Sequence, residues 1–296
     1  MKRLLALLLA ISLLMLPACQ NAAPDRLSIV TSVYPIYCMA LNLTRGAQGV
    51  TVRSLSNATS GCAHDYQLTS ADRRSLADAD VVVINGAGLE PYLDALLPTL
   101  KNVADSSEGI ELIASSDAHD AAGLNPHTWV SIERAIIQLR NIKEALVTAD
   151  SKNADVYEKN CLDYTAKLQA EYKNIKAALA PYAGTQIVTF HPAFDYFAQD
   201  MGLVVAGSLV IEPEAPPTAR ELRELIAEIE SSGAKAMFVE LGDIPDSAAT
   251  VARDTGISVY ALDPAAVPLE GVADIDRYVY AMEYNLGVLQ SALDGD

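Results

Sequence analysis

The chain has 296 residues, of which 51% are hydrophobic and 20% charged, a composition typical of a folded protein and not of a disordered one. It carries 21 lysines and arginines against 38 aspartates and glutamates, a formal net charge of −17. Proteins that bind nucleic acid contact the phosphate backbone through basic patches, and this sequence shows none. Nucleic acid is therefore excluded as a partner.

Residues 1–18 have the pattern of a secretory signal peptide. Two basic residues precede an apolar run, Leu4 to Leu16, which is shorter than the roughly 20 residues that span a bilayer. The following Pro-Ala-Cys resembles a bacterial lipobox, in which the cysteine is lipidated. We expect Cys19 to be the lipidated mature N-terminus and residues 19–26 to form a tether, which places the protein on the outer face of the bacterial cell membrane. The alternative is an ordinary signal peptide with an incidental Cys19.

Between residues 27 and 150, short β-rich runs alternate with helical segments. The β-rich runs are Leu27–Val33, Val50–Leu55 and Asp80–Ile84. The last of them is almost continuously apolar, which is typical of strands that are covered on both faces in a parallel sheet. The pattern predicts an N-terminal α/β lobe.

A long helix is predicted over residues 151–181. Apolar side chains recur every three or four positions from Tyr157 to Leu179 with no internal glycine or proline, and Pro181 and Gly184 end the pattern. A helix of this length spans about 45 Å, enough to run along two lobes. We expect it to act as a stiff connector that permits only small tilts between them.

Residues 182–296 repeat the pattern of the first half and predict a second α/β lobe. Its expected strands are Gln186–Phe190, Leu203–Leu209, Ala236–Val239 and Ser258–Leu262. The fold class is therefore α/β, with two lobes joined by one helix and a cleft between them.

Three histidines and two carboxylates are candidate metal ligands. His64 and His127 lie in the first lobe, whereas His191, Glu240 and Asp263 each follow a predicted strand of the second lobe. In open α/β sheets, ligands bind beyond the carboxyl ends of the strands, so several of these side chains are expected to converge. Each histidine taken alone is more typical of an ordinary hydrogen-bonded residue.

Zinc fits the expected set of His64, His127, His191 and Asp263. It prefers four ligands in a tetrahedron and accepts both imidazole nitrogen and carboxylate oxygen. Two ligands would come from each half of the chain, so the ion would lie in the interlobe cleft. Glu240 has two open roles, as an additional oxygen ligand or as a hydrogen-bond acceptor that orients a ligating histidine.

The cysteines of the mature chain other than Cys19 are Cys38, Cys62 and Cys161. Cys161 falls on the apolar stripe of the long helix and is expected to be a small buried residue. Outside the cytosol, Cys38 and Cys62 can pair as a disulfide. The alternative is that the thiol of Cys62, two residues before His64, serves the metal.

These motifs together resemble the metal-specific solute-binding lipoproteins of zinc and manganese ABC importers, the ZnuA-like cluster A-I family. The resemblance covers about residues 27 to 293. It implies two Rossmann-like lobes joined by a backbone helix, with one ion held by His64, His127, His191 and Asp263. It also implies delivery to a permease and its ATPase by a monomeric receptor without enzymatic activity. The matching elements are Thr31–Ile36, His64-x-Tyr66, Asp80–Asn85 with Gly88-Leu89-Glu90, Pro126-His127-x-Trp129, His191-x-Ala-Phe-x-Tyr-Phe197 and Asp263-Pro264.

The chain departs from the family pattern in three places. Val130-Ser131-Ile132 replaces the usual Leu-Asp-Pro, and Gln67 replaces a glutamate, but neither change removes a ligand. Zinc receptors of the family often carry a His-rich loop before the position of His127. Here His119 alone occupies that region, and we expect it to be a solvated loop residue.

The nitrogen-rich ligand set favours zinc as the transported ion, with manganese as the alternative. The metal sites of manganese-selective relatives look like sets of two histidines and two carboxylates, which is consistent with the preference of manganese for harder oxygen ligands. In this chain the third ligand of the expected set is a histidine, His191, and not a carboxylate. Functions of other classes are a cell-surface zinc hydrolase, which would need an open coordination position, and a surface adhesin.

Overall fold

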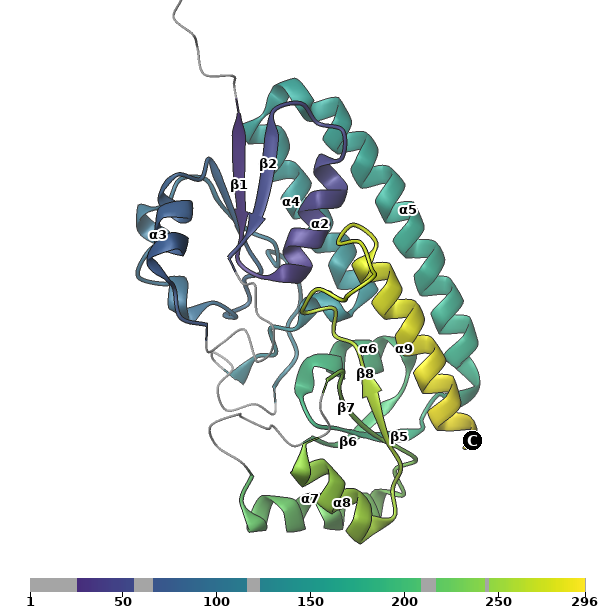
Figure 1. Ribbon diagram of the computed structural model, residues 1–296. Helices are drawn as coiled ribbons and strands as arrows, with labels where there is room; N and C mark the ends of the chain where they lie inside the picture. The colour runs from purple at the N-terminus through teal and green to yellow at the C-terminus, as the bar shows by residue number, and fades with distance from the viewer. Residues whose placement is uncertain (1–25, 56–65, 116–122, 209–216, 243–244, 296) are drawn as a thin grey trace, which may run out of the picture.

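The computed structural model describes residues 26–55, 66–115, 123–208, 217–242 and 245–295 (Figure 1). Within these ranges the chain forms two lobes, each built on a four-stranded parallel sheet. The predicted α/β class and the two-lobe architecture are confirmed. In the described part of the chain, no helix is both long and apolar enough to cross a bilayer.

The first lobe contains a sheet in the order β2-β1-β3-β4. Its central strands are largely buried, with Ile29 of β1 beside Val81 of β3, as a sheet covered on both faces requires. The strands are β1 (Leu27–Thr31), β2 (Val50–Ser54), β3 (Val81–Ile84) and β4 (Val103–Asp105), and the helices are α2 (Tyr34–Thr44), α3 (Ser70–Ala77) and α4 (Ile132–Ala149).

The second lobe repeats this arrangement with the order β6-β5-β7-β8. Strands β5, β7 and β8 are neighbours, so their carboxyl ends lie together at one edge of the sheet. The strands are β5 (Gln186–Thr189), β6 (Val204–Ser208), β7 (Met237–Glu240) and β8 (Val259–Leu262), and the helices are α6 (Asp195–Met201), α7 (Ala219–Ser232), α8 (Asp246–Thr255) and α9 (Arg277–Asp294).

Local sequence signals set several helix ends. Thr69 and Thr218 each begin a helix with a capping box, in which the threonine hydroxyl and an acidic side chain three residues later satisfy free backbone N–H groups. Gly233 and Gly256 end α7 and α8 in the left-handed conformation that glycine adopts without steric cost. Short 3-10 turns complete the connections at Pro91–Leu93, Leu97–Thr99, Thr128–Val130, Ser151–Asn153, Ala180–Tyr182 and Pro192–Phe194.

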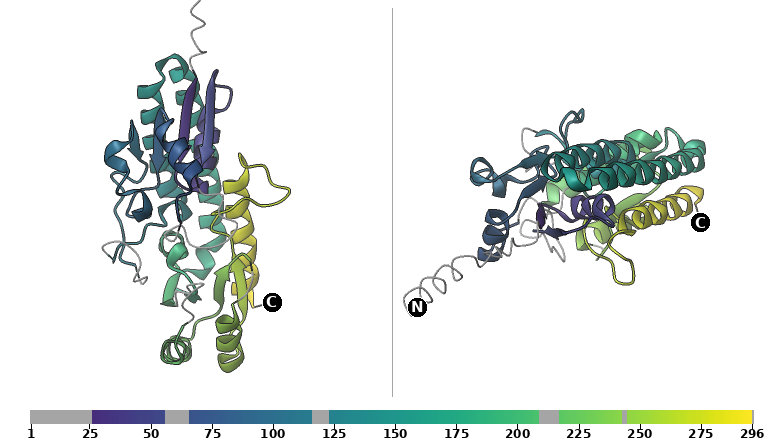
Figure 2. Two further views of the ribbon diagram at one scale, coloured as in Figure 1. Left: turned by 60° about the vertical axis from the view of Figure 1, so that its left-hand side comes forward. Right: turned by 90° about the horizontal axis from the view of Figure 1, so that it is seen from above.

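One 26-residue helix, α5 (Ala154–Leu179), runs along one side of both lobes (Figures 1 and 2). It packs on α2 and α4 of the first lobe and on α6 and α9 of the second. Its buried stripe, which includes Tyr157, Leu168 and Ile175, belongs to a single hydrophobic core that also contains Ile29 and Phe197 from the two lobes. This shared core joins the lobes on the side of α5.

Both described cysteines, Cys38 and Cys161, are buried free thiols. The predicted burial of Cys161 on the apolar face of α5 is confirmed, since it is 6% exposed. Cys38 lies on α2 and is 1% exposed, and burial raises the pKa of its thiol to about 12. The predicted bridge from Cys38 to Cys62 stays a prediction, because Cys62 lies outside the described residues.

Candidate metal centre

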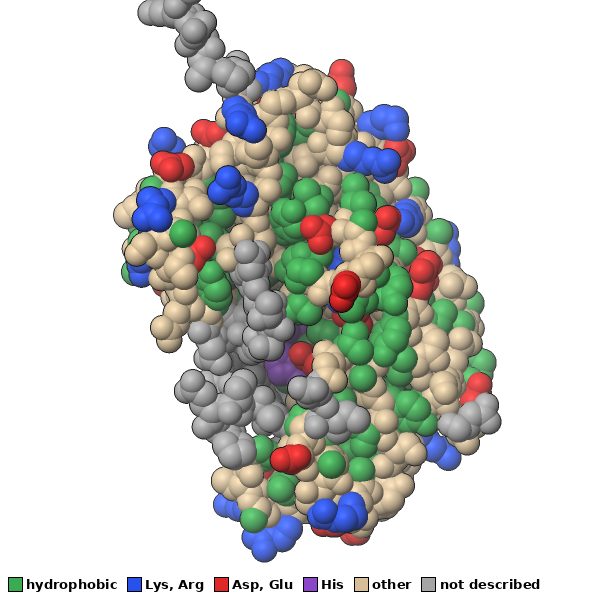
Figure 3. All heavy atoms as spheres, viewed as in Figure 1, with side chains coloured by type: hydrophobic (Ala, Val, Ile, Leu, Met, Phe, Trp, Pro, Cys, Tyr) green, Lys and Arg blue, Asp and Glu red, His purple; other side chains and the backbone are tan. Residues whose placement is uncertain are grey.

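The structure brings together two of the predicted ligands, His127 and His191. Their ring centroids are 4.6 Å apart and the ring planes are nearly perpendicular, at 80°. His127 precedes the 3-10 turn that leads into α4, and His191 follows β5 in the other lobe. Histidine side chains are visible in a hollow between the two lobes (Figure 3).

The tautomer of His127 is set by Asn125. The amide nitrogen Nδ2 of Asn125 donates to the carbonyl of Pro192 at 2.7 Å, which identifies Oδ1 as its acceptor end. This Oδ1 accepts from the backbone N–H of His127 and lies 2.9 Å from its ring Nδ1. Since Oδ1 can only accept, Nδ1 carries the proton and Nε2 keeps the lone pair that a metal needs.

Glu240 plays the same part for His191. The carboxylate Oε1 lies 2.9 Å from Nδ1 of His191, a position that favours the tautomer with the proton on Nδ1. Glu240 therefore makes the orienting contact expected as one of its two roles, and direct ligation stays a prediction.

Asp263 immediately follows β8 and is 1% exposed. Its Oδ1 accepts from the backbone N–H of Ala265 at 2.8 Å and from Nη2 of Arg277 at 2.7 Å. Its Oδ2 is buried and has no hydrogen-bond partner among the described residues. Sequence analysis missed Arg277, because no motif or spacing connects the start of α9 with the end of β8.

Hydrogen bonds across the lobe boundary join the loops that carry these side chains. Tyr196, in the helix after His191, donates to the carbonyl of Asn125 at 2.6 Å. Trp129 donates from Nε1 to the carbonyl of Pro264 at 2.8 Å, and Tyr278 donates to the carbonyl of Trp129 at 2.7 Å. The loop of His127 is therefore fixed to the loops of both His191 and Asp263.

The remaining predicted site residues, His64, Cys62 and Cys19, lie outside the described residues, as does His119. Within the described part of the chain, no group of three or more histidine, cysteine, aspartate or glutamate side chains is placed to hold a metal ion. The four-ligand set is thus still a prediction, of which the structure describes the histidine pair and the environment of Asp263.

The His127 loop is also supported from within the first lobe. Asn85, at the end of β3, donates from Nδ2 to the carbonyl of Pro126 at 3.0 Å. The buried carboxylate of Glu90 holds the turn after β3, because it accepts from the backbone N–H groups of Asn85 and Gly86 and from the hydroxyl of Ser32 at 2.5 Å. Burial raises the pKa of Glu90 to about 7, although these three hydrogen bonds lower it.

This raised pKa predicts that Glu90 makes stability depend on pH. Its ordinary pKa is 4.5, so the folded state binds the proton more tightly than the unfolded state. The resulting stabilisation, up to about 3 kcal/mol, is complete below pH 4.5 and is lost as the pH rises through 7. Urea unfolding at pH 5 and pH 8 should show wild type losing more stability than Glu90→Gln over this interval. Equal losses would contradict the assignment.

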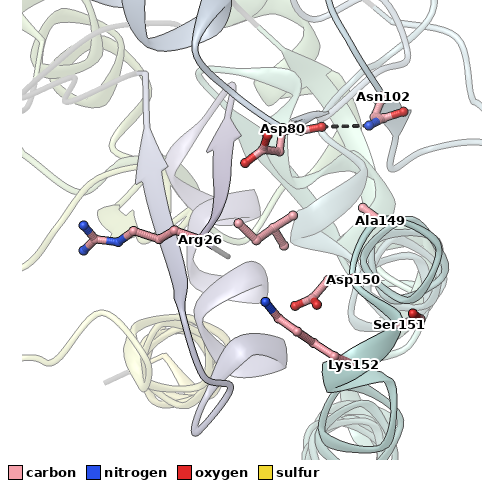
Figure 4. Close-up of a pocket in the computed structure, with 8 residues that line it drawn as sticks. Arg26, Asp80, Asn102, Ala149, Asp150, Ser151 and Lys152 are labelled. Carbon is pink, nitrogen blue, oxygen red and sulfur yellow. Dashed lines mark hydrogen bonds between the residues drawn. The ribbon is translucent and has the colours of Figure 1, made fainter. Parts of the chain in front are cut away.

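A cavity lies at the amino ends of the first-lobe strands (Figure 4). Its volume is about 470 Å³, and it is lined by polar residues that include Asp80, Asn102, Asp150 and Lys152. Asn102 donates to the carbonyl of Asp80 at 2.9 Å across it. This cavity has no histidine in its lining and lies at the amino ends of the strands, away from the histidine pair.

Two α/β lobes joined by one long helix, with imidazoles from opposite lobes side by side, are the arrangement of a binding protein that holds its ligand between two lobes. Residues 29–292 match the family described as ZnuA, zinc-uptake complex component A, periplasmic. The chain belongs to this family, which confirms the resemblance in the sequence motifs.

Three similar proteins illustrate the range of the family. The zinc-binding lipoprotein AdcA of Streptococcus pneumoniae serotype 4 is 28% identical over 316 residues, which cover 99% of this chain but 62% of AdcA. The manganese ABC transporter substrate-binding lipoprotein PsaA of Streptococcus pneumoniae is 27% identical over 287 residues, 93% of this chain and 91% of PsaA. The solved structure of a mutant Mn-bound periplasmic metal binding protein from Candidatus Liberibacter asiaticus is 26% identical with a TM-score of 0.80, covering 90% of this chain and 100% of that one.

The protein is therefore a substrate-binding component of a metal ABC importer, which works with a permease and an ATPase, and it is not an enzyme. The hydrolase alternative is excluded. The family does not fix the metal, because its members are named for zinc and for manganese.

Proposed function

We propose that this protein captures zinc outside the cytoplasm and delivers it to the permease of its importer. The ion is held by His64, His127, His191 and Asp263, one ion per chain. The observation that supports this proposal is the histidine pair, whose rings lie 4.6 Å apart with both Nδ1 atoms facing acceptor oxygens. Acceptors at both Nδ1 atoms favour the tautomers that bind a metal through Nε2.

Imidazole nitrogen suits zinc better than it suits manganese, which prefers carboxylate, carbonyl and water oxygens. Three imidazoles and one carboxylate complete a tetrahedral zinc site without an open position. Manganese is the second candidate, because PsaA, at a similar level of identity, is named for it. The two metals differ in the number of oxygen ligands that they require, and this difference can be measured.

The proposed setting of the receptor follows from its N-terminus. Residues 1–18 act as the signal peptide, Cys19 carries the lipid, and residues 19–26 tether a monomer to the outer face of the membrane. The lobes comprise residues 27–150 and 182–296, joined by the connector at 151–181. A lipid anchor keeps the receptor near the permease without a transmembrane helix.

Elemental analysis of the protein from its native membrane tests this function. We expect about one zinc per chain after purification without added metal, and anomalous scattering at the zinc edge from a site between the lobes. Recovery of manganese or iron in place of zinc would contradict the zinc assignment. A chain that neither carries nor binds any divalent metal would contradict the receptor function itself.

A further inference from the structure

The two oxygens of Asp263 have different environments. Oδ1 accepts two N–H groups, from Ala265 at 2.8 Å and from Arg277 at 2.7 Å. A carboxylate oxygen has two lone-pair directions, so these donors saturate Oδ1. Oδ2 is equally buried but has no hydrogen-bond partner in the described ranges. One oxygen therefore has a structural role, and the other is available to a cation.

The residues around Asp263 prevent its carboxylate from turning. The Asp263 backbone is held at both ends by Asn285, which accepts from its N–H at 2.7 Å and donates to its carbonyl at 2.8 Å. The Arg277 guanidinium is 1% exposed and also donates from Nε to the carbonyl of Val267 at 3.0 Å. Ala265 has a φ of 58° and is fully buried, and in this conformation its N–H donates to Oδ1.

We propose, on the basis of the metal-binding function above, that Arg277 is a positioning residue for metal selectivity. By holding Oδ1, Arg277 restricts Asp263 to a single oxygen, Oδ2, for the ion. The site then supplies few oxygen ligands and favours zinc over manganese.

The physical basis is the cost of using both oxygens. A carboxylate that chelates through two oxygens raises the coordination number and the share of oxygen ligands, which suits manganese but not tetrahedral zinc. For Asp263, chelation would displace the charge-assisted bond from Arg277 and leave a buried guanidinium without its partner. Breaking a buried ion pair in this way is strongly unfavourable. A tetrahedral ion needs only Oδ2 and leaves the pair intact.

The test is the ratio of manganese to zinc affinity in the mature chain carrying Arg277→Met, which retains the volume of the stem but removes one of the two donors to Oδ1. We expect the dissociation constant for manganese, relative to that for zinc, to fall about tenfold, a typical effect of changing an outer contact of a metal ligand. Co²⁺ serves as the spectroscopic probe, since four-coordinate cobalt absorbs visible light more strongly than five- or six-coordinate cobalt. The band should weaken in the variant.

Arg134→Met is the matched control. Arg134 also forms a largely buried ion pair, with Asp200 at 2.9 Å, but its partner is not a proposed ligand. We expect this variant to lose stability and to change the two affinities by a common factor. If Arg277→Met also changed both affinities by a common factor and left the cobalt band unaltered, the selectivity role would be overturned.

Two further measurements apply if Arg277→Met does not fold. Arg277→Lys keeps the charge but cannot replace both guanidinium contacts, so its affinity ratio should shift in the same direction by a smaller factor. Wild type should give a four-coordinate cobalt spectrum. A five- or six-coordinate wild-type spectrum would overturn this inference and leave the receptor function intact, whereas wild type that binds none of the three metals would overturn both.

Discussion

Replacing His191 with alanine is expected to weaken zinc binding by more than about 100-fold. Replacing a residue that hydrogen-bonds to a metal ligand costs about 10–100-fold in metal affinity, and the loss of the ligand itself should cost more than this. The variant removes one of the two imidazoles that lie 4.6 Å apart. Competition titration against a chromophoric chelator measures the effect directly.

Two controls separate ligation from support. Glu240→Gln retains an acceptor oxygen for Nδ1 of His191 but removes the charge that lies 2.9 Å away, so we expect a loss of about tenfold or less. His119→Ala should leave zinc affinity unchanged, because His119 is not among the proposed ligands. A comparable loss in His119→Ala and His191→Ala would contradict the ligand assignment.

The inner strands β3, β5 and β7 could be predicted because they are short, mostly apolar runs that are largely buried. The run Asp80–Ile84 was predicted and Val81–Ile84 is found, and Leu203–Leu209 was predicted where β6 spans Val204–Ser208. The edge strand β4 was missed. It has only three residues with no apolar run, and two of them are exposed, so neither periodicity nor hydropathy distinguishes it from a loop.

The site could be predicted only where residue type alone carries the chemistry. His127 and His191 were found because imidazole and strand ends are visible in a sequence. Asn125 and Arg277 were not assigned a role, because their functions depend on contacts with Pro192 and Asp263 that only the folded chain makes. The burial of Cys38 could not be predicted either, since cysteine count and compartment say nothing of which face of α2 a thiol occupies.

Asn125 contacts both His127 and Pro192, the residue next to His191. Among the residues that are not proposed ligands, its substitution therefore has the largest predicted effect on metal affinity. A single buried side chain fixes the tautomer of His127 through Oδ1 and holds the carbonyl of Pro192, next to His191, through Nδ2. These two contacts belong to different lobes. Their loss should affect the protonation of one ligand and the placement of both.

Asn125→Ala is therefore expected to weaken zinc binding by about 10–100-fold and to lower the free energy of unfolding by about 1–3 kcal/mol. The first figure is typical of outer contacts of metal ligands. The second reflects the backbone N–H of His127, a buried donor that would lose its partner at about 1–3 kcal/mol, whereas the carbonyl of Pro192 keeps the bond from the N–H of Asp195. Zinc titration below the unfolding transition and urea unfolding of the metal-free chain measure the two effects separately.

Asn141→Ala is the matched control for this prediction. Asn141 also donates through its amide nitrogen to two carbonyls, those of Ser106 and Glu108 at 2.8 and 2.9 Å, but it contacts no proposed ligand. Its loss should lower stability and leave zinc affinity unchanged. If Asn125→Ala behaved in the same way, the amide would support the fold alone, and the preference of His127 for binding through Nε2 would have to arise from the metal and not from the protein.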